Sequence, residues 1–343
     1  MTGAIIIVGP EITGTSVSAR SDHSVRSAEQ LQRGIPLTCV EVLGRSVLDR
    51  LSDELRKIGI DAVTVVADRC FEAARSDVDQ AISLPISWVE DAWSSATRML
   101  MHYRENGIDT ALVIRPGAYA ELDYADVLQY HREGNQGTTR AYSEDVPLDI
   151  WVVDGNRFSA GEQIRDTFLA GNGARYAVEG YVNHLEHPRD LRRLVTDALS
   201  SRCRLRPQGC ETRPGVWMNE GAEVHRSARI VAPAFIGRDS RIEEQCLITR
   251  CSSVESNCQI DYGTVIEDSS ILPNSYVGIG LDISHSIIQG NSLLNLERDV
   301  TLEIADPGVM RLNRVLRKEA NRQSPMSLGL VEMSLASVEK DVR

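Results

Sequence analysis

Aliphatic side chains return at every sixth position in the second half of this chain, and this period constrains the fold more than any other feature. A small side chain stands four residues after each of the first eight. An α-helix has a period of 3.6 residues and a β-strand a period of 2, so neither produces a six-residue repeat. The repeat predicts a parallel β-helix, in which each hexad forms one flat face and three faces close one coil. The aliphatic positions are Val224, Ile230, Ile236, Ile242, Ile248, Val254, Ile260, Ile266 and Leu272, and the small ones are Ala228, Ala234, Ser240, Cys246, Ser252, Cys258, Thr264 and Ser270.

The aliphatic pattern continues beyond Leu272 with two interruptions. Val277, Ile283 and Ile288 add a fourth coil if the chain skips one residue before Val277 and another before Ile288. After the coil, residues 306–321 have apolar side chains at helical spacing, which predicts an amphipathic helix followed by a loosely held tail.

Strand-like and helix-like segments alternate over the first 200 residues. This alternation is typical of an α/β domain with a doubly wound, mostly parallel sheet and helices on both faces. Residues 201–215 are polar and basic and contain proline and glycine, so we predict a linker there. The predicted domains are therefore 1–200 (α/β), 201–215 (linker), 216–305 (β-helix) and 306–343 (helix and tail). The predicted strands are 4–8, 62–67, 110–114 and 150–153, and the predicted helices are 45–58, 88–103, 124–131 and 189–199.

Composition and charge exclude several classes of protein. The formal net charge is −12, and no block of lysine and arginine interleaves with aromatic residues, which argues against binding to nucleic acid or an anionic membrane. The longest apolar run, 4–8, is too short to span a bilayer. Seven cysteines without a Cys-x-x-Cys pair argue against a disulfide framework or a structural zinc site. A reducing, cytoplasmic location is the simplest expectation.

Three stretches resemble segments of the sugar nucleotidyltransferases, enzymes that join a sugar 1-phosphate to a nucleoside triphosphate and release pyrophosphate. Residues 36–48 read PLTCVEVLGRSVL and resemble the family's PKPLLPVLGKPLL. Residues 121–133, ELDYADVLQYHRE, are similar to the stretch after the family's central Gly-Asp, and 180–190, GYVNHLEHPRD, resemble GYWxDIGTPED. The resemblance implies a nucleotidyltransferase-like α/β domain followed by a hexapeptide-repeat left-handed parallel β-helix.

The resemblance also implies where the chemistry would lie. The family's two metal-binding aspartates fall on Gly117 and His184, and its lysine falls on Leu37. Glycine has no ligand atom, and Mg²⁺ prefers oxygen donors to a lone imidazole. The family's phosphate-binding turn corresponds to the segment after Gly9, where Pro10 has no N–H to donate. Nucleotide contacts in this region would come from Gly9, Gly14, Thr15 and Arg33.

The missing carboxylates lead to our first hypothesis, a pseudoenzyme that keeps the architecture and has lost the reaction. No catalytic residue, metal or cofactor is expected. Such a chain would be a structural or regulatory component of nucleotide-sugar and surface-polysaccharide biosynthesis. A homo-oligomer, or a pair with an active nucleotidyltransferase relative, is expected, since coil ends and faces need covering. A nucleotide sugar is a candidate ligand.

Two alternatives remain open at the level of sequence. An active, Mg²⁺-dependent sugar-1-phosphate nucleotidyltransferase would need relocated metal ligands. The acids available beside the two family positions are Glu121, Asp123, Glu179 and Glu186. A hexapeptide-repeat acyltransferase would use a coil histidine as its base, and His225 and His285 are the candidates. A transition-metal site at His184 and His187 is disfavoured, because a histidine near a helix start is usually structural.

Overall fold

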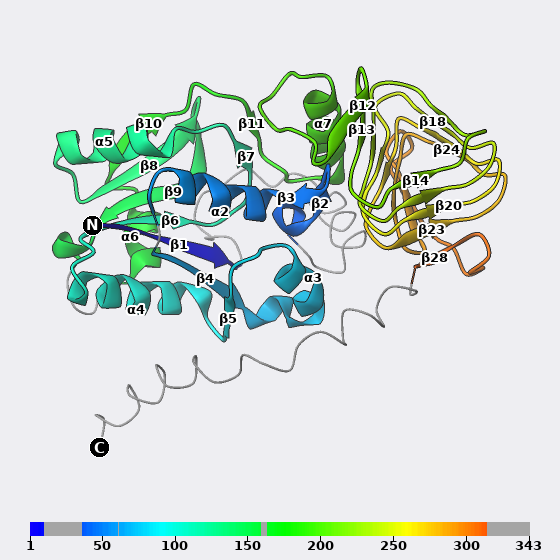
Figure 1. The fold of residues 1–343 in the computed structure, drawn as a ribbon. Helices are drawn as coiled ribbons and strands as arrows, with labels where there is room; N and C mark the ends of the chain where they lie inside the picture. Colours follow the sequence, from blue (N-terminus) through cyan, green and yellow to red (C-terminus); the bar gives the residue numbers. More distant parts are fainter. Residues whose placement is uncertain (10–35, 61, 159–162, 314–343) are drawn as a thin grey trace.

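The computed structural model of the chain describes residues 1–9, 36–60, 62–158 and 163–313 (Figure 1). An α/β region is followed along the chain by a stack of short strands, and the two regions lie side by side. None of the helices in these described ranges is both long enough and apolar enough to cross a membrane.

A seven-stranded sheet forms the centre of the α/β region. Its four strands at one side are all parallel, with β1 between β4 and β6 and with β5 at the edge, whereas β9 runs antiparallel to both β6 and β8. The sheet is therefore mixed, with a parallel half that begins at β6. The order is β10 (Ala174–Ala177), β8 (Thr138–Ser143), β9 (Val146–Asp154), β6 (Thr110–Ile114), β1 (Thr2–Val8), β4 (Val63–Asp68) and β5 (Ile86–Val89).

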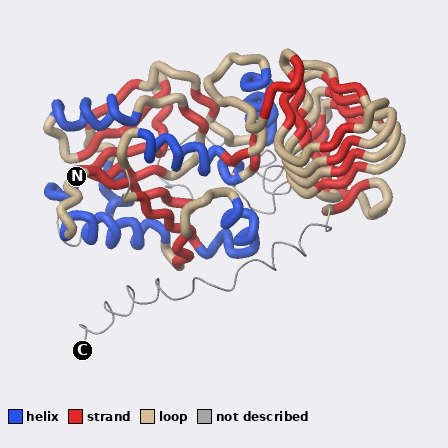
Figure 2. Tube along the Cα trace, in the orientation of Figure 1, coloured by secondary structure: helices blue, strands red, loops and turns tan. Residues whose placement is uncertain are grey.

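Helices cover both faces of this sheet (Figure 2). On β1 the side chains alternate: Ile6 packs in one core with α2 (Val47–Lys57) and α5 (Tyr124–Gly134). Ile7 packs on the opposite face with α4 (Ala92–Glu105) and α6 (Ile164–Ala170), where Trp93, Trp151 and Phe168 form an aromatic cluster. The remaining elements are α3 (Arg75–Gln80), α7 (Pro188–Leu199), the 3₁₀ turns η1 (Leu37–Cys39), η2 (Arg69–Ala74) and η3 (Gly155–Arg157), and the strand pairs β2 (Glu41–Val42) with β3 (Arg45–Ser46) and β7 (Tyr119–Ala120) with β11 (Val182–Asn183).

Residues 210–312 form three further sheets of short, mostly parallel strands, as in a β-helix. The first contains β12 (Cys210–Arg213), β13 (Val216–Met218), β16 (Ala234–Ile236), β19 (Ser253–Val254), β22 (Ser270–Ile271), β25 (Ser286–Gln289), β26 (Ser292–Asn295) and β27 (Val300–Glu303). The second contains β14 (Glu223–Val224), β17 (Arg241–Ile242), β20 (Gln259–Ile260), β23 (Ser275–Val277) and β28 (Met310–Leu312). The third contains β15 (Arg229–Ile230), β18 (Leu247–Thr249), β21 (Val265–Glu267) and β24 (Asp282–Ser284).

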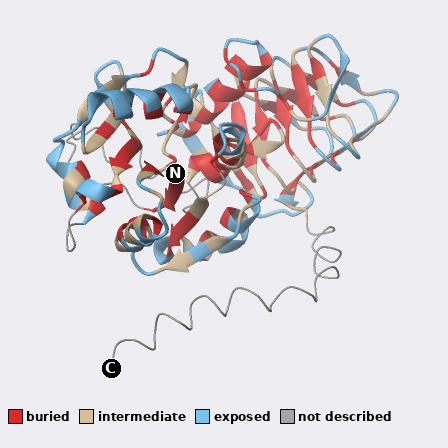
Figure 3. Ribbon diagram, turned by 60° about the vertical axis from the view of Figure 1, so that its left-hand side comes forward, coloured by how far each residue is buried: buried red, intermediate tan, exposed pale blue. Residues whose placement is uncertain are grey.

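The predicted six-residue register is observed as far as Ile266 and then slips earlier than predicted. Ile248 stacks on Ile266, which is one coil of 18 residues, whereas Val254 stacks on Ile271, a coil of 17. Ile271, not the predicted Leu272, therefore enters the coil interior. The Leu272 side chain points out of the coil and is buried in the core that the coil shares with the α/β region. Figure 3 shows the buried residues along these strands.

Small side chains stack at the corners of the coil and bond to its backbone. The Ser252 hydroxyl accepts from the backbone N–H of Ser269, and the Ser269 hydroxyl accepts from that of Ser286. Ser269 therefore occupies this corner, although the six-residue repeat placed its small side chain at Ser270. Ser270 instead accepts a hydrogen bond from Ser253 on the neighbouring strand.

Two predicted helices and the predicted linker need correction. The helix predicted over 306–321 is wrong for its described part, because residues 307–309 form a turn and β28 pairs antiparallel with β23. Residues 314–321 lie outside the described residues. The helix predicted over 88–103 begins later, since residues 86–89 form β5 and Asp91 caps α4 by accepting from two backbone N–H groups. Within the predicted linker 201–215, residues 210–213 form β12, which pairs with β13.

Apolar side chains join the coil to the α/β region. Phe235, Ile287 and Leu294 project from the first coil sheet and belong to the same buried core as α2 and α7. Polar contacts also join the two regions, since the Arg192 guanidinium of α7 donates to the carboxylate and the carbonyl of Asp268 in the coil. The two regions therefore share one core.

A buried glutamate holds a turn of the α/β region against the coil. The two carboxylate oxygens of Glu255 accept from the backbone N–H groups of Leu43 and Gly44, each at 3.0 Å. These two residues form the β2–β3 turn, and both have a positive φ, which favours glycine at the second position. Glu41, on β2, accepts from the hydroxyl of Ser256 next along the coil. Burial, and then the charge of Glu41, raise the pKa of the Glu255 carboxyl to about 8, although the two N–H donors oppose this shift.

We expect Ile266→Ala to lower the free energy of unfolding by about 2–5 kcal/mol, because it leaves a cavity in the closed interior of the coil. Ile266 is fully buried, whereas Ile279 on the same coil is 65% exposed. Ile279→Ala is therefore the matched control and should change the free energy by less than about 0.5 kcal/mol. Urea denaturation measures both, and equal effects would contradict the assignment of Ile266 to the interior.

We expect Glu255 to make the chain less stable as the pH rises from about 5 to about 8. Its pKa is higher in the folded than in the unfolded chain, so its contribution is fully present below pH 4.5 and is lost as the pH rises through about 8. Urea denaturation of the wild type and of Glu255→Gln at both pH values measures this effect. The loss between the two pH values should be smaller in the variant, by an amount on the order of a kcal/mol or more. The same pH dependence in both proteins would contradict the prediction.

Candidate functional site

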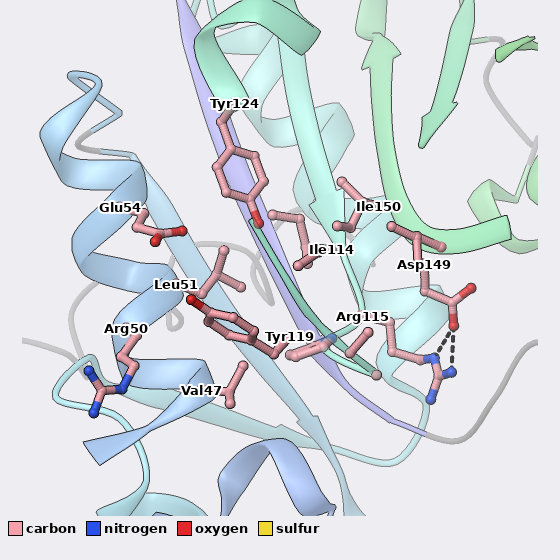
Figure 4. A pocket seen from close by; sticks show the side chains of 15 residues that line it. Val47, Arg50, Leu51, Glu54, Ile114, Arg115, Tyr119, Tyr124, Asp149 and Ile150 are labelled. Carbon is pink, nitrogen blue, oxygen red and sulfur yellow. Dashed lines mark hydrogen bonds and ion pairs between the residues drawn. The ribbon is translucent and has the colours of Figure 1, made fainter. Parts of the chain in front are cut away.

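The candidate site lies at the carboxyl end of β6, between α2 and the central strands β6 and β9 of the sheet (Figure 4). Parallel α/β sheets commonly bind ligands at the carboxyl ends of their strands. A cavity of about 30 Å³ is present here, which is room for one or two water molecules. It is lined by Val47, Arg50, Leu51, Glu54, Ile114, Arg115, Pro116, Gly117, Ala118, Tyr119, Ala120, Tyr124, Leu148, Asp149 and Ile150.

The structure brings together the three segments that carry the positions of the family's catalytic residues. The hydroxyl of Thr38, next to Leu37, donates to the carbonyl of Pro116 at 2.9 Å, so the η1 turn lies against the loop that contains Gly117. In the β7–β11 pair, Asn183 is opposite Tyr119, which brings the residue before His184 alongside the same loop. Leu37, Gly117 and His184 therefore lie on segments that meet around one loop.

A guanidinium group lies where the resemblance would place a metal ligand. A Cβ atom added to Gly117 would meet a terminal nitrogen of Arg115 at 3.2 Å. Arg115 is held in place by Asp149, whose carboxylate accepts from its Nε at 2.5 Å and forms an ion pair with its terminal nitrogen. Asp149 also pairs with Arg140 at 3.1 Å. All three side chains are at most 16% exposed. Each of the two Asp149 oxygens therefore already accepts from a guanidinium group.

The acids proposed as substitute metal ligands are engaged elsewhere or point to solvent. Glu121 accepts from the backbone N–H of Arg204, lies 3.7 Å from its guanidinium and bonds to the hydroxyl of Tyr119. Asp123 caps α5 by accepting from the N–H groups of residues 125 and 126. Glu179 and Glu186 are both exposed. The described residues thus bring none of the four together as a pair at Gly117.

A magnesium ion does not fit the side chains of this site. Mg²⁺ is usually held by one or two carboxylates with several waters. Among the described residues no group of three or more histidine, cysteine or acidic side chains could hold a metal ion. Two acids line the cavity beside Gly117, Glu54 on α2 and Asp149, and the Asp149 carboxylate is already shared by two guanidinium groups. We therefore derive no step that uses a metal here.

The predicted phosphate-binding residues are described only in part. Gly9 follows β1 and is buried, and a Cβ at this position would lie 3.4 Å from that of Ala92 at the start of α4. Gly14, Thr15 and Arg33 lie outside the described residues. Leu37, at the position of the family's lysine, is 8% exposed and packs in the core. It provides no charge for a phosphate group.

Several side chains at the site were not predicted from the sequence. Tyr119 and Tyr124 point into the space beside α2 (Figure 4), and burial raises the pKa of both phenols, which remain uncharged hydroxyl groups. Asp149 and Arg140 were also missed. Asp149 is the only charged residue between Asp145 and Asp154 on an otherwise largely apolar strand, and that isolation was the available signal.

The two coil histidines proposed as acyl-transfer bases have partners within the coil. The Nδ1 atom of His225 lies 2.8 Å from the hydroxyl of Ser227. That of His285 lies 2.7 Å from the Asp268 carboxylate, which also binds Arg192 of α7. His285 is therefore part of the contact between the coil and the α/β region.

No protein-family model matches the chain, and a search of curated proteins found no match. The resemblance to sugar nucleotidyltransferases thus depends on the three segments named above and on their positions in this fold.

We expect Asp149→Asn to lower the free energy of unfolding by about 1–3 kcal/mol, because two mostly buried guanidinium groups lose their shared counter-charge. Asp145→Asn is the matched control. The Asp145 carboxylate is fully exposed and forms a surface ion pair with Arg175, so the change should have almost no effect. Urea denaturation compares the two variants, and equal stabilities would contradict a structural role for Asp149.

Proposed function

We propose that this chain is a catalytically degenerate relative of the sugar nucleotidyltransferases. It serves as a structural or regulatory component of nucleotide-sugar and surface-polysaccharide biosynthesis in the cytoplasm. The three matching segments support this proposal, as does the order of regions, an α/β domain before a parallel coil. We also propose that the coil is left-handed, because the same resemblance implies it.

The observation that carries the proposal is the Arg115 guanidinium beside Gly117. Catalysis in the family would require a divalent cation at this point, to neutralise charge as phosphate oxygens rearrange. Here a fixed protein cation lies next to the residue that replaces the metal ligand, and Asp149 holds it there. Exchange of a metal for an arginine keeps a positive charge but removes the ability to polarise and align two phosphate groups.

The size of the cavity favours a structural role over ligand binding. Pockets for small molecules usually enclose roughly 300–1,000 Å³. The cavity between α2 and β6 measures about 30 Å³ in the described structure. A nucleotide sugar would have to displace α2 or the Tyr119 loop to enter it. Binding to an active relative, or to a second copy, requires no such movement, and we therefore favour it as the role of this fold.

Pyrophosphate release tests the proposal directly. The full chain should produce none above background with Mg²⁺ and a panel of sugar 1-phosphates and nucleoside triphosphates, while an authentic sugar nucleotidyltransferase assayed in parallel turns over. Both Glu121→Ala and the matched variant Glu179→Ala should remain equally inactive.

Clear Mg²⁺-dependent turnover by the wild type that disappears in Glu121→Ala would reject the proposal and support relocated ligands. A thermal-shift assay with the same nucleotides and with nucleotide sugars supplies a second readout. Stabilisation by a nucleotide sugar without turnover would identify a regulatory ligand, and stabilisation by acetyl-coenzyme A would instead favour acyl transfer.

A further inference from the structure

The first coil sheet continues beyond the parallel coil by two antiparallel strands. β26 pairs with β25, and β27 pairs with β26 along its whole length, from Val300 opposite Asn295 to Glu303 opposite Ser292. β27 is the last strand of this eight-stranded sheet. Apart from this ladder, no backbone hydrogen bond joins residues 300–303 to another described residue. Within the described part of the chain, one edge of β27 therefore has no partner for its N–H and C=O groups.

β27 is only partly protected as an edge strand. Proteins guard such edges with short strands, charged side chains, proline or bulges, because an open edge pairs with another chain. β27 is four residues long and ends at the exposed Glu303, but it contains no lysine or proline. The strand reads Val-Thr-Leu-Glu, and its two aliphatic side chains are largely exposed, Val300 by 43% and Leu302 by 49%. Residues at alternate positions share one face of a strand, so the two side chains form a continuous apolar stripe.

We propose that β27 pairs antiparallel with β27 of a second copy of this chain and joins the two coil sheets across a twofold axis. A second copy fits because the strand is complementary to itself. If Leu302 lies on the axis, it faces its own counterpart. Val300 then lies opposite position 304 of the other copy, just beyond the end of the strand, where Ile304 is partly buried against its own coil. In the same register the positive Arg298 of each copy faces the negative Asp306 of the other.

The same residue contacts occur twice in such an interface, as a closed dimer requires. The apolar stripe and the flanking charges match in a single register, so the pairing is specific as well as attractive. Because only short strands meet, the dissociation constant is expected to be on the order of micromolar. The interface lies in the coil and does not involve the cleft beside Arg115, so the proposal stands whether or not the proposed function is correct.

Sedimentation velocity of the full chain between about 1 and 100 µM tests the interface. The wild type should change from monomer to dimer over this range. Leu302→Lys places two positive charges on the axis and should weaken the dimer by about tenfold or more. Ile279→Lys is the matched control, since Ile279 is even more exposed but lies away from β27, and it should dimerise like the wild type.

Charge reversal tests the register. Arg298→Glu should weaken the dimer, and addition of Asp306→Arg should restore part of the loss. A wild type that stays monomeric throughout overturns the proposal, and so does a dimer that Leu302→Lys leaves intact. Slow hydrogen exchange at residues 300–303 in a monomer would show that another part of the same chain covers the edge, which also overturns it.

Discussion

The contact between the buried Glu255 carboxylate and the Leu43–Gly44 turn fixes the relation of the two regions of this molecule. The turn leads directly into α2, and α2 forms one wall of the candidate cleft. The position of that wall is thus set by a residue of the coil that lies more than 200 positions later in the sequence. Arg50 on α2 strengthens the link, since its guanidinium donates to the carbonyls of Val42 and of Arg206. The coil therefore helps to position one wall of the cleft, which is itself lined by residues of the α/β region.

The cleft is stabilised at one side by a cluster of mostly buried ion pairs. The Asp149 carboxylate is shared by Arg115 and Arg140 beside a small cavity. Such a cluster costs free energy of desolvation, which the ion pairs and the bond from the Arg115 backbone N–H to the Asp149 carbonyl offset. Because each Asp149 oxygen already accepts from a guanidinium group, this carboxylate is engaged in the structure of the cleft.

The sequence predicted the parts of the structure that depend on local periodicity. The coil register to Ile266 and the strand at 110–114 were predicted correctly, because each is encoded in neighbouring residues. The slip at Ile271 was misplaced, since Ile271 and Leu272 are adjacent and equally apolar. The apolar pattern after Asp306 fits a helix as well as a strand, and only pairing with β23 decides between them. Glu255 and Asp149 resemble surface acids in the sequence, because their partners are distant in the chain.

The proposed loss of catalysis depends on which residues stand at the family's metal-binding positions, and periodicity does not reveal them. Gly117 and His184 could be named from three short segments, but the meaning of the glycine became clear only when Arg115 was found beside it. A glycine in place of an aspartate leaves a hole that water and metal could still occupy. A glycine that makes room for a guanidinium does not, because the space is filled by a group of the same charge as the metal. Under the proposed function, the absence of the carboxylate and the position of Arg115 are two parts of one change, in which a structural ion pair replaces a metal site.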